Sequence, residues 1–203
     1  MTSICIYSDS LNFFRSWLSD PLRVASVTPS SRSLARLITR EAADGRVLEL
    51  GPGTGVFTRA LIERGVREED LVLVECGTEF AAVLKERFPA STILSIDAAR
   101  LAEGRPEISA GIGAAVSGLP LLSMPPRKVI AILAGIFLHM RPGGQLYQFT
   151  YGPRCPIPRP LLDRLGLRAK RVGGTIRNFP PASVYRISRR QPSSLAGMFG
   201  PRG

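Results

Sequence analysis

The feature that most constrains this chain is the segment RVLELGPGTGVFTRAL, residues 46–61. An apolar strand-like run there leads into three closely spaced glycines and then a helical pattern. Gly51, Gly53 and Gly55 have no Cβ, so the loop can turn sharply and its backbone can approach a ligand closely. A strand, a glycine-rich loop and a helix in this order are typical of ligand-binding α/β folds. The segment therefore favours a sheet with a ligand at the carboxyl ends of its strands.

The rest of the chain continues this alternation of strands and helices. Segments that read as buried strands occur at 46–50, 71–75, 91–96, 112–117 and 145–150, with helical patterns at about 55–64, 78–87 and 127–139. Such alternation implies right-handed crossovers and a mostly parallel sheet. After residue 165, LRAKRVGGTIRNF and SVYRISRR read as two strands without a helix between them, which indicates an antiparallel edge. A length of 203 residues fits one such domain with a full core.

A carboxylate stands directly before the glycine loop, and its sign limits the ligand. Glu49 is the next-to-last residue of the first predicted strand. A pyrophosphate held at this loop and helix start would be repelled by that carboxylate. The position therefore favours a ligand with positive charge. S-adenosylmethionine (SAM) fits, because its sulfonium and ammonium are cationic while its carboxylate can accept from the loop N–H groups.

Two further acids follow the next two predicted strands. Glu75 ends the second strand, the place where a carboxylate can accept both ribose hydroxyls, and Asp97 follows the third, where it can accept from the adenine amine. Open α/β sheets bind ligands at these strand ends, so the three acids together predict one site. The alternative is that Glu49, Glu75 and Asp97 merely cap helices.

The motifs VLELGPGTGVFT, LVLVE, SID and MRPGGQLYQFTYGP resemble those of class I SAM-dependent methyltransferases over residues 46–153. The form ELGPGTG is similar to two branches, the rRNA adenine dimethyltransferases and the bacterial phosphatidylethanolamine N-methyltransferases. The resemblance implies a seven-stranded Rossmann-like sheet with one antiparallel strand between helices, and S-adenosyl-L-homocysteine as product. The implied cofactor contacts are Glu49, Gly51, Gly53, Thr54, Gly55, Glu75, Cys76, Asp97, Ala98 and Ser31. Ser31 is included because VASVTPSSRSLARLI resembles the N-terminal segment of the phospholipid branch.

The fourth predicted strand separates the two branches. The adenine enzymes resemble one another in an Asn followed by prolines and an aromatic residue, which stacks on a flipped-out base. Here AAVSGLPLLSMPP places Ser117 at the Asn and Leu121 where the aromatic would be. No side chain in the motif can stack a base, which favours an amine that is already exposed, and SGLPLL resembles the phospholipid branch. Carbonyl groups of Ser117, Gly118 and Leu119 and the hydroxyl of Tyr151 are the candidates for orienting that amine.

The segment LNFFRSWLS, residues 11–19, has the pattern of an interfacial helix. At about 100° per residue one face gathers its apolar side chains, which are Leu11, Phe13, Phe14, Trp17 and Leu18. Two phenylalanines and a tryptophan beside an arginine are typical of a helix lying on a membrane. A helix packed on its own domain is the alternative.

The segment IRNFPPASVYRI resembles the C-terminal motif of the phospholipid branch. It predicts that Arg177, Asn178 and Tyr185 hold the lipid phosphate. The alternative for Arg177 is an ordinary arginine at a sheet edge.

Charge and cysteine content add expectations about partners. The net charge is +11, and residues 127–203 hold 14 basic residues against one acid, Asp163. This balance reflects either a GC-rich genome or a surface for polyanions such as lipid phosphates. Cys5, Cys76 and Cys155 show no metal-ligand spacing, so reduced thiols in a cytosolic compartment are expected. We expect a peripheral protein on the inner face of a bacterial cytoplasmic membrane that prefers anionic lipids and needs neither metal nor nucleic acid.

The predicted organisation has three parts: an N-terminal amphipathic helix and lid at 1–40, a methyltransferase domain at 41–190, and a loose tail at 191–203. The predicted function is SAM-dependent N-methylation of phosphatidylethanolamine, through mono- and dimethyl intermediates toward phosphatidylcholine. An rRNA adenine or small-molecule methyltransferase of the same fold is the alternative, followed by a binding protein without catalysis.

Overall fold

The computed structural model describes residues 29–42, 45–103, 108, 111–176 and 181–190. The predicted interfacial helix with Leu11, Phe13, Phe14, Trp17 and Leu18 lies outside the described residues, as do the tail at 191–203 and the pair Arg177 and Asn178.

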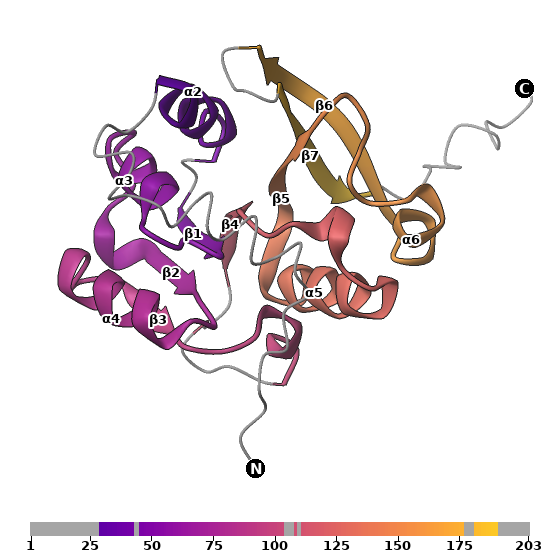
Figure 1. The fold of residues 1–203 in the computed structure, drawn as a ribbon. Coiled ribbons are helices and arrows are strands. Elements are labelled where there is room, and N and C mark those ends of the chain that lie inside the picture. Colours follow the sequence, from indigo (N-terminus) through magenta and orange to yellow (C-terminus); the bar gives the residue numbers. More distant parts are fainter. Residues whose placement is uncertain (1–28, 43–44, 104–107, 109–110, 177–180, 191–203) are drawn as a thin grey trace, which may run out of the picture.

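A seven-stranded sheet with the order β3-β2-β1-β4-β5-β7-β6 organises the chain (Figure 1). Its strands are β1 Arg46–Leu50, β2 Leu71–Val74, β3 Thr92–Leu94, β4 Ile112–Ser117, β5 Met140–Tyr151, β6 Leu167–Thr175 and β7 Ala182–Arg189. The first five pair in parallel, while β7 runs antiparallel to both of its neighbours, β5 and β6. The mostly parallel sheet with an antiparallel C-terminal strand is therefore confirmed, and β6, not β7, forms the edge.

Strand β5 begins five residues earlier than the predicted strand at 145–150. The register shifts between Ile112↔Met140 and Ala114↔Gln145, which marks a bulge around Arg141–Gly144. Gly143 adopts φ 81° there. The proline and two glycines of this segment suggest a turn in the sequence, but the structure places them in an irregular start of the strand.

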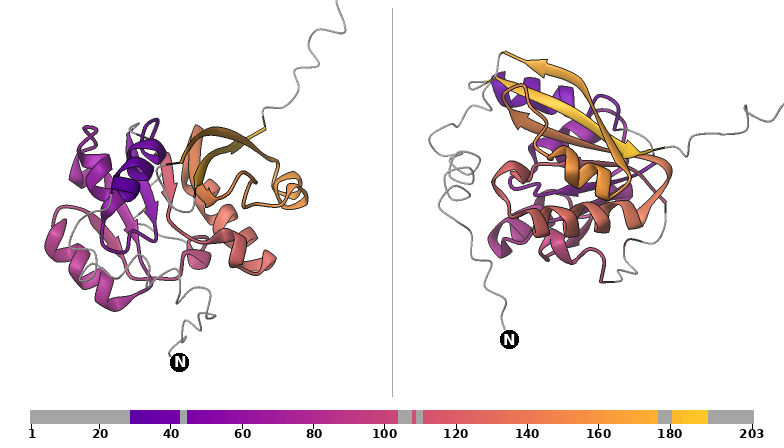
Figure 2. Two further views of the ribbon diagram at one scale, coloured as in Figure 1. Left: turned by 45° about the horizontal axis from the view of Figure 1, so that its top comes forward. Right: turned by 90° about the vertical axis from the view of Figure 1, so that its right-hand side faces the viewer.

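Helices cover both faces of the sheet (Figures 1 and 2). On one face lie α2 Pro29–Ile38, α3 Val56–Ile62 and α4 Thr78–Arg87, and on the other α5 Pro126–His139 and α6 Arg159–Arg164. Short 3-10 turns, η1 Glu68–Asp70, η2 Ala98–Arg100 and η4 Leu121–Ser123, join some of the elements. Helix α6 was not predicted, because six residues are too few to show a helical period.

Two apolar clusters fill the space on either side of the sheet. Strand β1 shows the alternation: Leu48 and Leu50 pack toward α5 and α6, while Val47 packs toward α2, α3 and α4. Glu49 points to the same side as Val47 and is completely buried. A carboxyl group is thus held inside an apolar layer, next to the glycine loop.

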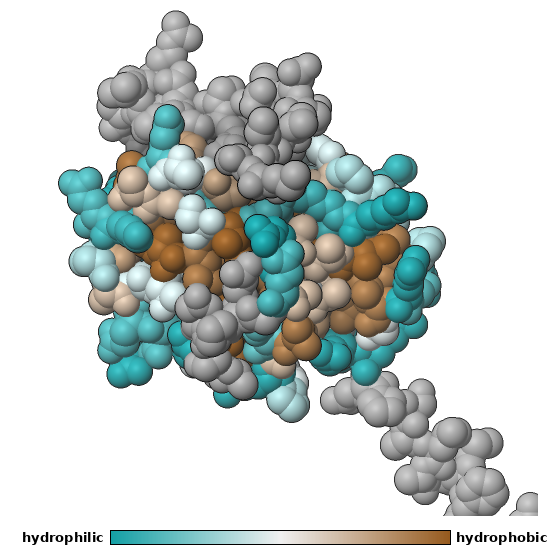
Figure 3. Space-filling model, turned by 90° about the horizontal axis from the view of Figure 1, so that it is seen from below, coloured by the Kyte–Doolittle hydropathy of each residue, from teal (hydrophilic) through white to brown (hydrophobic). Residues whose placement is uncertain are grey.

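The surface of the described residues mixes hydrophilic and hydrophobic side chains, and the view from below shows hydrophobic patches surrounded by hydrophilic groups (Figure 3). Large apolar side chains are exposed at Leu122, Leu138 and Ile176. Within the described part of the chain, no helix combines the length and the apolar character that a bilayer span needs.

Candidate functional site

The loops after β1 and β4 meet backbone to backbone at the carboxyl edge of the sheet. The Gly51 N–H donates to the Val74 carbonyl at 2.9 Å, and the Gly118 N–H donates to the Leu50 carbonyl at 2.8 Å. A Cβ on Gly118 would lie 2.8 Å from the Gly51 carbonyl oxygen. Only glycine at position 118 therefore allows the two loops to approach so closely.

The glycine loop itself follows a left-handed course. Gly51, Gly53 and Gly55 have φ values of 65°, 55° and 82°, which other residues rarely adopt. At Gly55 a Cβ would also lie 2.4 Å from the Phe88 ring. The loop shape predicted from the three glycines is present, and packing against α4 adds a second reason for one of them.

Glu49 lies at the foot of this loop with half of its carboxyl group unsatisfied. Thr58 of α3 donates its hydroxyl to Glu49 Oε2 at 2.7 Å, and Oε1 has no hydrogen-bond partner among the described residues. Burial is the main cause that raises the pKa of Glu49 to about 8, helped by the charge of Glu75 and opposed by the Thr58 hydrogen bonds. The group is therefore largely neutral at pH 7, and an adjacent cation would favour its ionised form.

Glu75, directly after β2, ties the glycine loop to the start of α4. Its carboxylate accepts from the Gly77 N–H at 2.9 Å and from the Gly53 N–H at 3.2 Å. The neighbouring Cys76 thiol lies 3.8 Å from Glu75 Oε1. Glu75 is 6% exposed, so its carboxylate reaches the glycine loop from within the fold.

Asp97 is held by two partners after β3. Its carboxylate accepts from the Ala99 N–H at 3.0 Å, which caps η2, and forms an ion pair with Lys128 Nζ at 2.6 Å. The alternative that these acids merely cap helices therefore holds in part for Asp97, whereas Glu49 caps no helix. The adjacent Ala98 is buried. Lys128, in the first turn of α5, was missed because no local pattern links it to a residue 31 positions earlier.

The predicted amine-orienting residues lie where β4 and β5 end side by side. Ser117 Oγ accepts from the Leu119 N–H at 3.2 Å. The buried Gln148 of β5 donates to the Leu119 carbonyl at 2.9 Å and to the Phe149 carbonyl at 2.8 Å, while its Oε1 has no partner among the described residues. Sequence reasoning missed Gln148, although an amide within the apolar run QLYQFT was a usable signal.

Two tyrosines flank this position on opposite faces of the sheet. Tyr151 packs edge-on against Phe149 with ring centroids 5.6 Å apart, and burial raises the pKa of its hydroxyl well above the usual range. The hydroxyl therefore stays protonated and is available as a hydrogen-bond donor. Tyr185 pairs with Gln148 across β7 and β5 and donates its hydroxyl to the Pro153 carbonyl. A phosphate would have to compete for that proton.

Thr54 and Ser31 are two further residues predicted to contact the cofactor. The Thr54 carbonyl accepts from Arg87 Nη1 at 2.7 Å, so this loop residue also contacts α4. Ser31 belongs to α2, and its side chain lies outside the described residues. No group of histidine, cysteine or carboxylate side chains within the described ranges could hold a metal ion.

Comparison with known proteins finds a similar sequence and similar folds. No family model matches the chain. An ornithine lipid N-methyltransferase of Singulisphaera acidiphila is similar to it, with 28% identity over 176 residues that cover 80% of this chain and 86% of that protein. The TehB-like SAM-dependent methyltransferase of Corynebacterium glutamicum superimposes with a TM-score of 0.62 at 16% identity, covering 89% of this chain and 98% of that one.

Two further solved structures have a similar fold. The DhpI–SAM–HEP complex has a TM-score of 0.63 at 17% identity and covers 93% of this chain and 100% of its own. The glycopeptide N-methyltransferase MtfA with sinefungin has a TM-score of 0.62 at 14% identity, and the match covers 81% of this chain and 96% of that one. The chain therefore has the Rossmann-like fold of class I methyltransferases.

Proposed function

We propose that this chain is a SAM-dependent N-methyltransferase that acts on the primary amine of a membrane lipid, with phosphatidylethanolamine as the first candidate. The observation that carries the proposal is the buried Glu49, whose unpartnered oxygen lies at the foot of the glycine loop. An unpaired acceptor inside an apolar layer is costly unless a ligand satisfies it. A cationic ligand suits this carboxyl group better than a pyrophosphate does.

The chain's own residues fit the proposed cofactor. SAM, when bound, supplies an activated methyl group on its sulfonium, and S-adenosyl-L-homocysteine remains. Glu49 would balance the positive charge of the methionine end, and Ser31 would contact the same end. Glu75 would accept the ribose hydroxyls. Asp97 would accept from the adenine amine while Lys128 holds its other oxygen, and Gly51, Gly53, Thr54, Gly55, Cys76 and Ala98 would form the walls.

For the acceptor, the chain supplies position more than proton transfer. An ammonium has no lone pair, so the substrate amine must lose a proton, which desolvation beside a cation favours. The Leu119 carbonyl accepts from the Gln148 amide, and it would accept an N–H of the substrate amine together with the carbonyls of Ser117 and Gly118. Tyr151 stays protonated and orients by donating. Alignment of well-oriented partners corresponds to effective molarities of about 10⁵–10⁸ M.

The motif after β4 favours a lipid over a nucleic-acid base. Leu121, at the position of the base-stacking aromatic, is 2% exposed and packs into the core under α5. The similar protein from Singulisphaera acidiphila acts on ornithine lipid, which makes ornithine lipid the second candidate substrate. Both candidates present an amine that needs no base flipping.

The membrane side of the proposal concerns residues outside the described ranges and Tyr185. Arg177 and Asn178, with Tyr185, would hold the headgroup phosphate. Leu11, Phe13, Phe14, Trp17 and Leu18 would place a helix in the interface, because apolar burial and attraction to anionic lipid together give reversible binding. The protein would then work peripherally on the inner face of the cytoplasmic membrane.

Transfer of a radiolabelled methyl group tests the proposal. The acceptors are vesicles with phosphatidylethanolamine, vesicles with ornithine lipid, and rRNA. We expect label in lipid, and loss of that label in Glu49→Ala and Glu75→Ala. Glu69→Ala is the matched control, because Glu69 is exposed in η1 before β2, at the opposite edge of the sheet. Label in rRNA alone, or in no acceptor, would contradict the proposal.

A further inference from the structure

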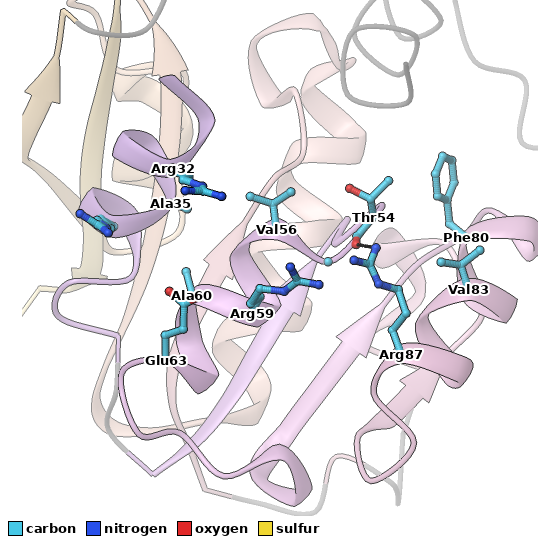
Figure 4. Close-up of a pocket in the computed structure, with 12 residues that line it drawn as sticks. Arg32, Ala35, Thr54, Val56, Arg59, Ala60, Glu63, Phe80, Val83 and Arg87 are labelled. Carbon is cyan, nitrogen blue, oxygen red and sulfur yellow. Dashed lines mark hydrogen bonds between the residues drawn. The ribbon is translucent and has the colours of Figure 1, made fainter. Parts of the chain in front are cut away.

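A groove with a volume of about 550 Å³ opens between α2, α3 and α4, on the sheet face that also buries Glu49 (Figure 4). It begins at Thr54 and Gly55, so it adjoins the glycine loop from the outside. None of the predicted phosphate or membrane residues lines it. Apart from Thr54 and Gly55, which also belong to the proposed cofactor site, the residues that line it have no role in the proposed reaction.

Four arginines from three helices give this groove its charge. Arg32 and Arg36 come from α2, Arg59 from α3 and Arg87 from α4, against one carboxylate, Glu63. In Figure 4, Arg59 and Arg87 extend from α3 and α4 toward the space between these helices. We call this surface the arginine groove.

Three of the four guanidinium groups are not used within the described part of the fold. Arg87 donates to the Thr54 carbonyl, whereas the side chains of Arg32, Arg36 and Arg59 have no hydrogen bond or ion pair with another described residue. All four side chains are exposed. Clustered like charges of this kind repel one another, and an anion between them would relieve that repulsion.

One wall of the groove is apolar. Phe80 and Val83 of α4 line it, and Val83 is 40% exposed. Arginines beside partly exposed apolar side chains suit an interface with lipid phosphates outside and acyl chains beneath. A nucleic-acid backbone would use the arginines but would gain little from these apolar side chains.

We propose that the arginine groove binds the phosphate of an anionic phospholipid and so docks the α2–α3–α4 face on the membrane beside the methyl-transfer site. This inference rests on the proposed function for its choice of a lipid over other phosphate-bearing partners. Docking there would bring the carboxyl edge of the sheet close to the membrane surface, where an amine substrate resides.

Co-sedimentation with vesicles tests the inference without any turnover. The probes are phosphatidylcholine vesicles with and without phosphatidylglycerol, and an RNA duplex. The test variant is Arg32→Gln with Arg59→Gln. The control is Arg141→Gln with Arg164→Gln, which removes the same charge from exposed positions outside the groove. Unchanged affinity for S-adenosyl-L-homocysteine and an unchanged melting temperature confirm that both variants are folded.

We expect the groove variant to bind anionic vesicles roughly tenfold more weakly than the natural chain, and the control variant to lose less than about threefold. The natural chain should also lose binding as salt rises, with a shallower dependence in the groove variant. Equal losses in the two variants, or a loss of RNA binding alone, would overturn the inference. Failure of methyl transfer to lipid with groove-dependent vesicle binding intact would instead refute the proposed function and leave the docking surface standing.

Discussion

Glu49 concentrates the chemistry of the site in one carboxyl group. It is fully buried and bonded through one oxygen to Thr58, and it carries a pKa of about 8 against an ordinary value of 4.5. In the unfolded chain the group ionises near the ordinary value, so the folded state holds one more proton between these two pH values. The free energy of unfolding therefore falls as pH rises through that window, and the loss is complete above the folded pKa.

Glu49→Gln should remove this penalty. Each pH unit between 5 and the folded pKa lowers the free energy of unfolding of the natural chain by about 1.4 kcal/mol. Because 1 kcal/mol corresponds to about 2–4 °C for a domain of this size, we expect the melting temperature of the variant, relative to the natural chain, to rise between pH 5 and pH 9 by an amount on the order of 10 °C. Thermal unfolding at both pH values measures the difference. A difference that does not change with pH would show that Glu49 does not titrate as the structure implies.

The same carboxyl group predicts a proton release when a cationic ligand binds. A positive charge next to Glu49 lowers its pKa, so binding of SAM at pH 7 should release up to one proton. Calorimetry in two buffers of different ionisation enthalpy measures that number. Glu49→Gln serves as the control and should release none through this position. Equal release by both proteins would assign the proton to another group.

Gln148 is the second residue whose role is local and testable. Gln148→Met keeps the volume but removes the hydrogen bond to the Leu119 carbonyl. A lost positioning hydrogen bond of about 1–1.5 kcal/mol corresponds to a roughly tenfold lower kcat. Steady-state kinetics measure kcat, and the affinity for S-adenosyl-L-homocysteine should stay the same. Gln145→Met is the control, because Gln145 lies in the same strand and accepts from the Tyr147 hydroxyl, away from the Leu119 carbonyl. Equal effects of both substitutions would refute a positioning role.

At the scale of elements, the glycine loop connects β1, α3 and α4 through two different constraints. Gly53 needs only its left-handed backbone, since a Cβ there would meet no atom within 4 Å. Gly55 needs the same backbone and also the space that Phe88 at the end of α4 leaves to it. The loop is thus set both by local conformation and by how α4 packs on α3.

The two constraints predict different costs for the same substitution. Gly53→Ala should lower the free energy of unfolding by about 1–2 kcal/mol, the cost of a left-handed residue. Gly55→Ala should cost roughly 1–3 kcal/mol more, because the added methyl group overpacks against Phe88. Urea unfolding of both variants gives the values. Equal costs would mean that Phe88 moves aside without penalty.

At the scale of the whole molecule, the segment at the end of α2 links the two halves of the sheet. Tyr147 of β5 donates to the Glu41 carbonyl at 3.1 Å, and Arg186 of β7 pairs with the Glu41 carboxylate at 3.1 Å. Arg40 donates to the Val172 carbonyl of β6 at 3.2 Å. Since α2 also packs on α3, it joins the antiparallel strands to the glycine-loop side of the molecule.

This linkage predicts one cooperative response to cofactor binding. S-adenosyl-L-homocysteine at about 100 times its dissociation constant should stabilise the chain by about 2.7 kcal/mol and raise its melting temperature by roughly 5–10 °C in one transition. Differential scanning calorimetry measures both. Glu49→Ala should lose most of the shift, and a pyrophosphate-bearing dinucleotide should give none. A shift with the dinucleotide alone would refute the cationic-ligand interpretation.

Much of the architecture could be predicted from the sequence because it depends on local patterns. The alternation of apolar runs and helical periods predicted the parallel strands, with β1 and β4 at their observed bounds, and the two C-terminal strands. The glycine spacing predicted the loop. The acids Glu49, Glu75 and Asp97 were located because the carboxyl ends of parallel strands share one edge of a sheet.

Tertiary structure alone decided which partner each of these groups has. Thr58 reaches Glu49 only because α3 packs on β1, and Gln148 reaches the Leu119 carbonyl only because β4 and β5 pair in their observed register. The arginine groove joins side chains of α2, α3 and α4 that no periodicity connects. A sequence pattern records which face of its own element a residue occupies. Contacts between elements depend on how the apolar layers pack, and that packing is a property of the whole chain.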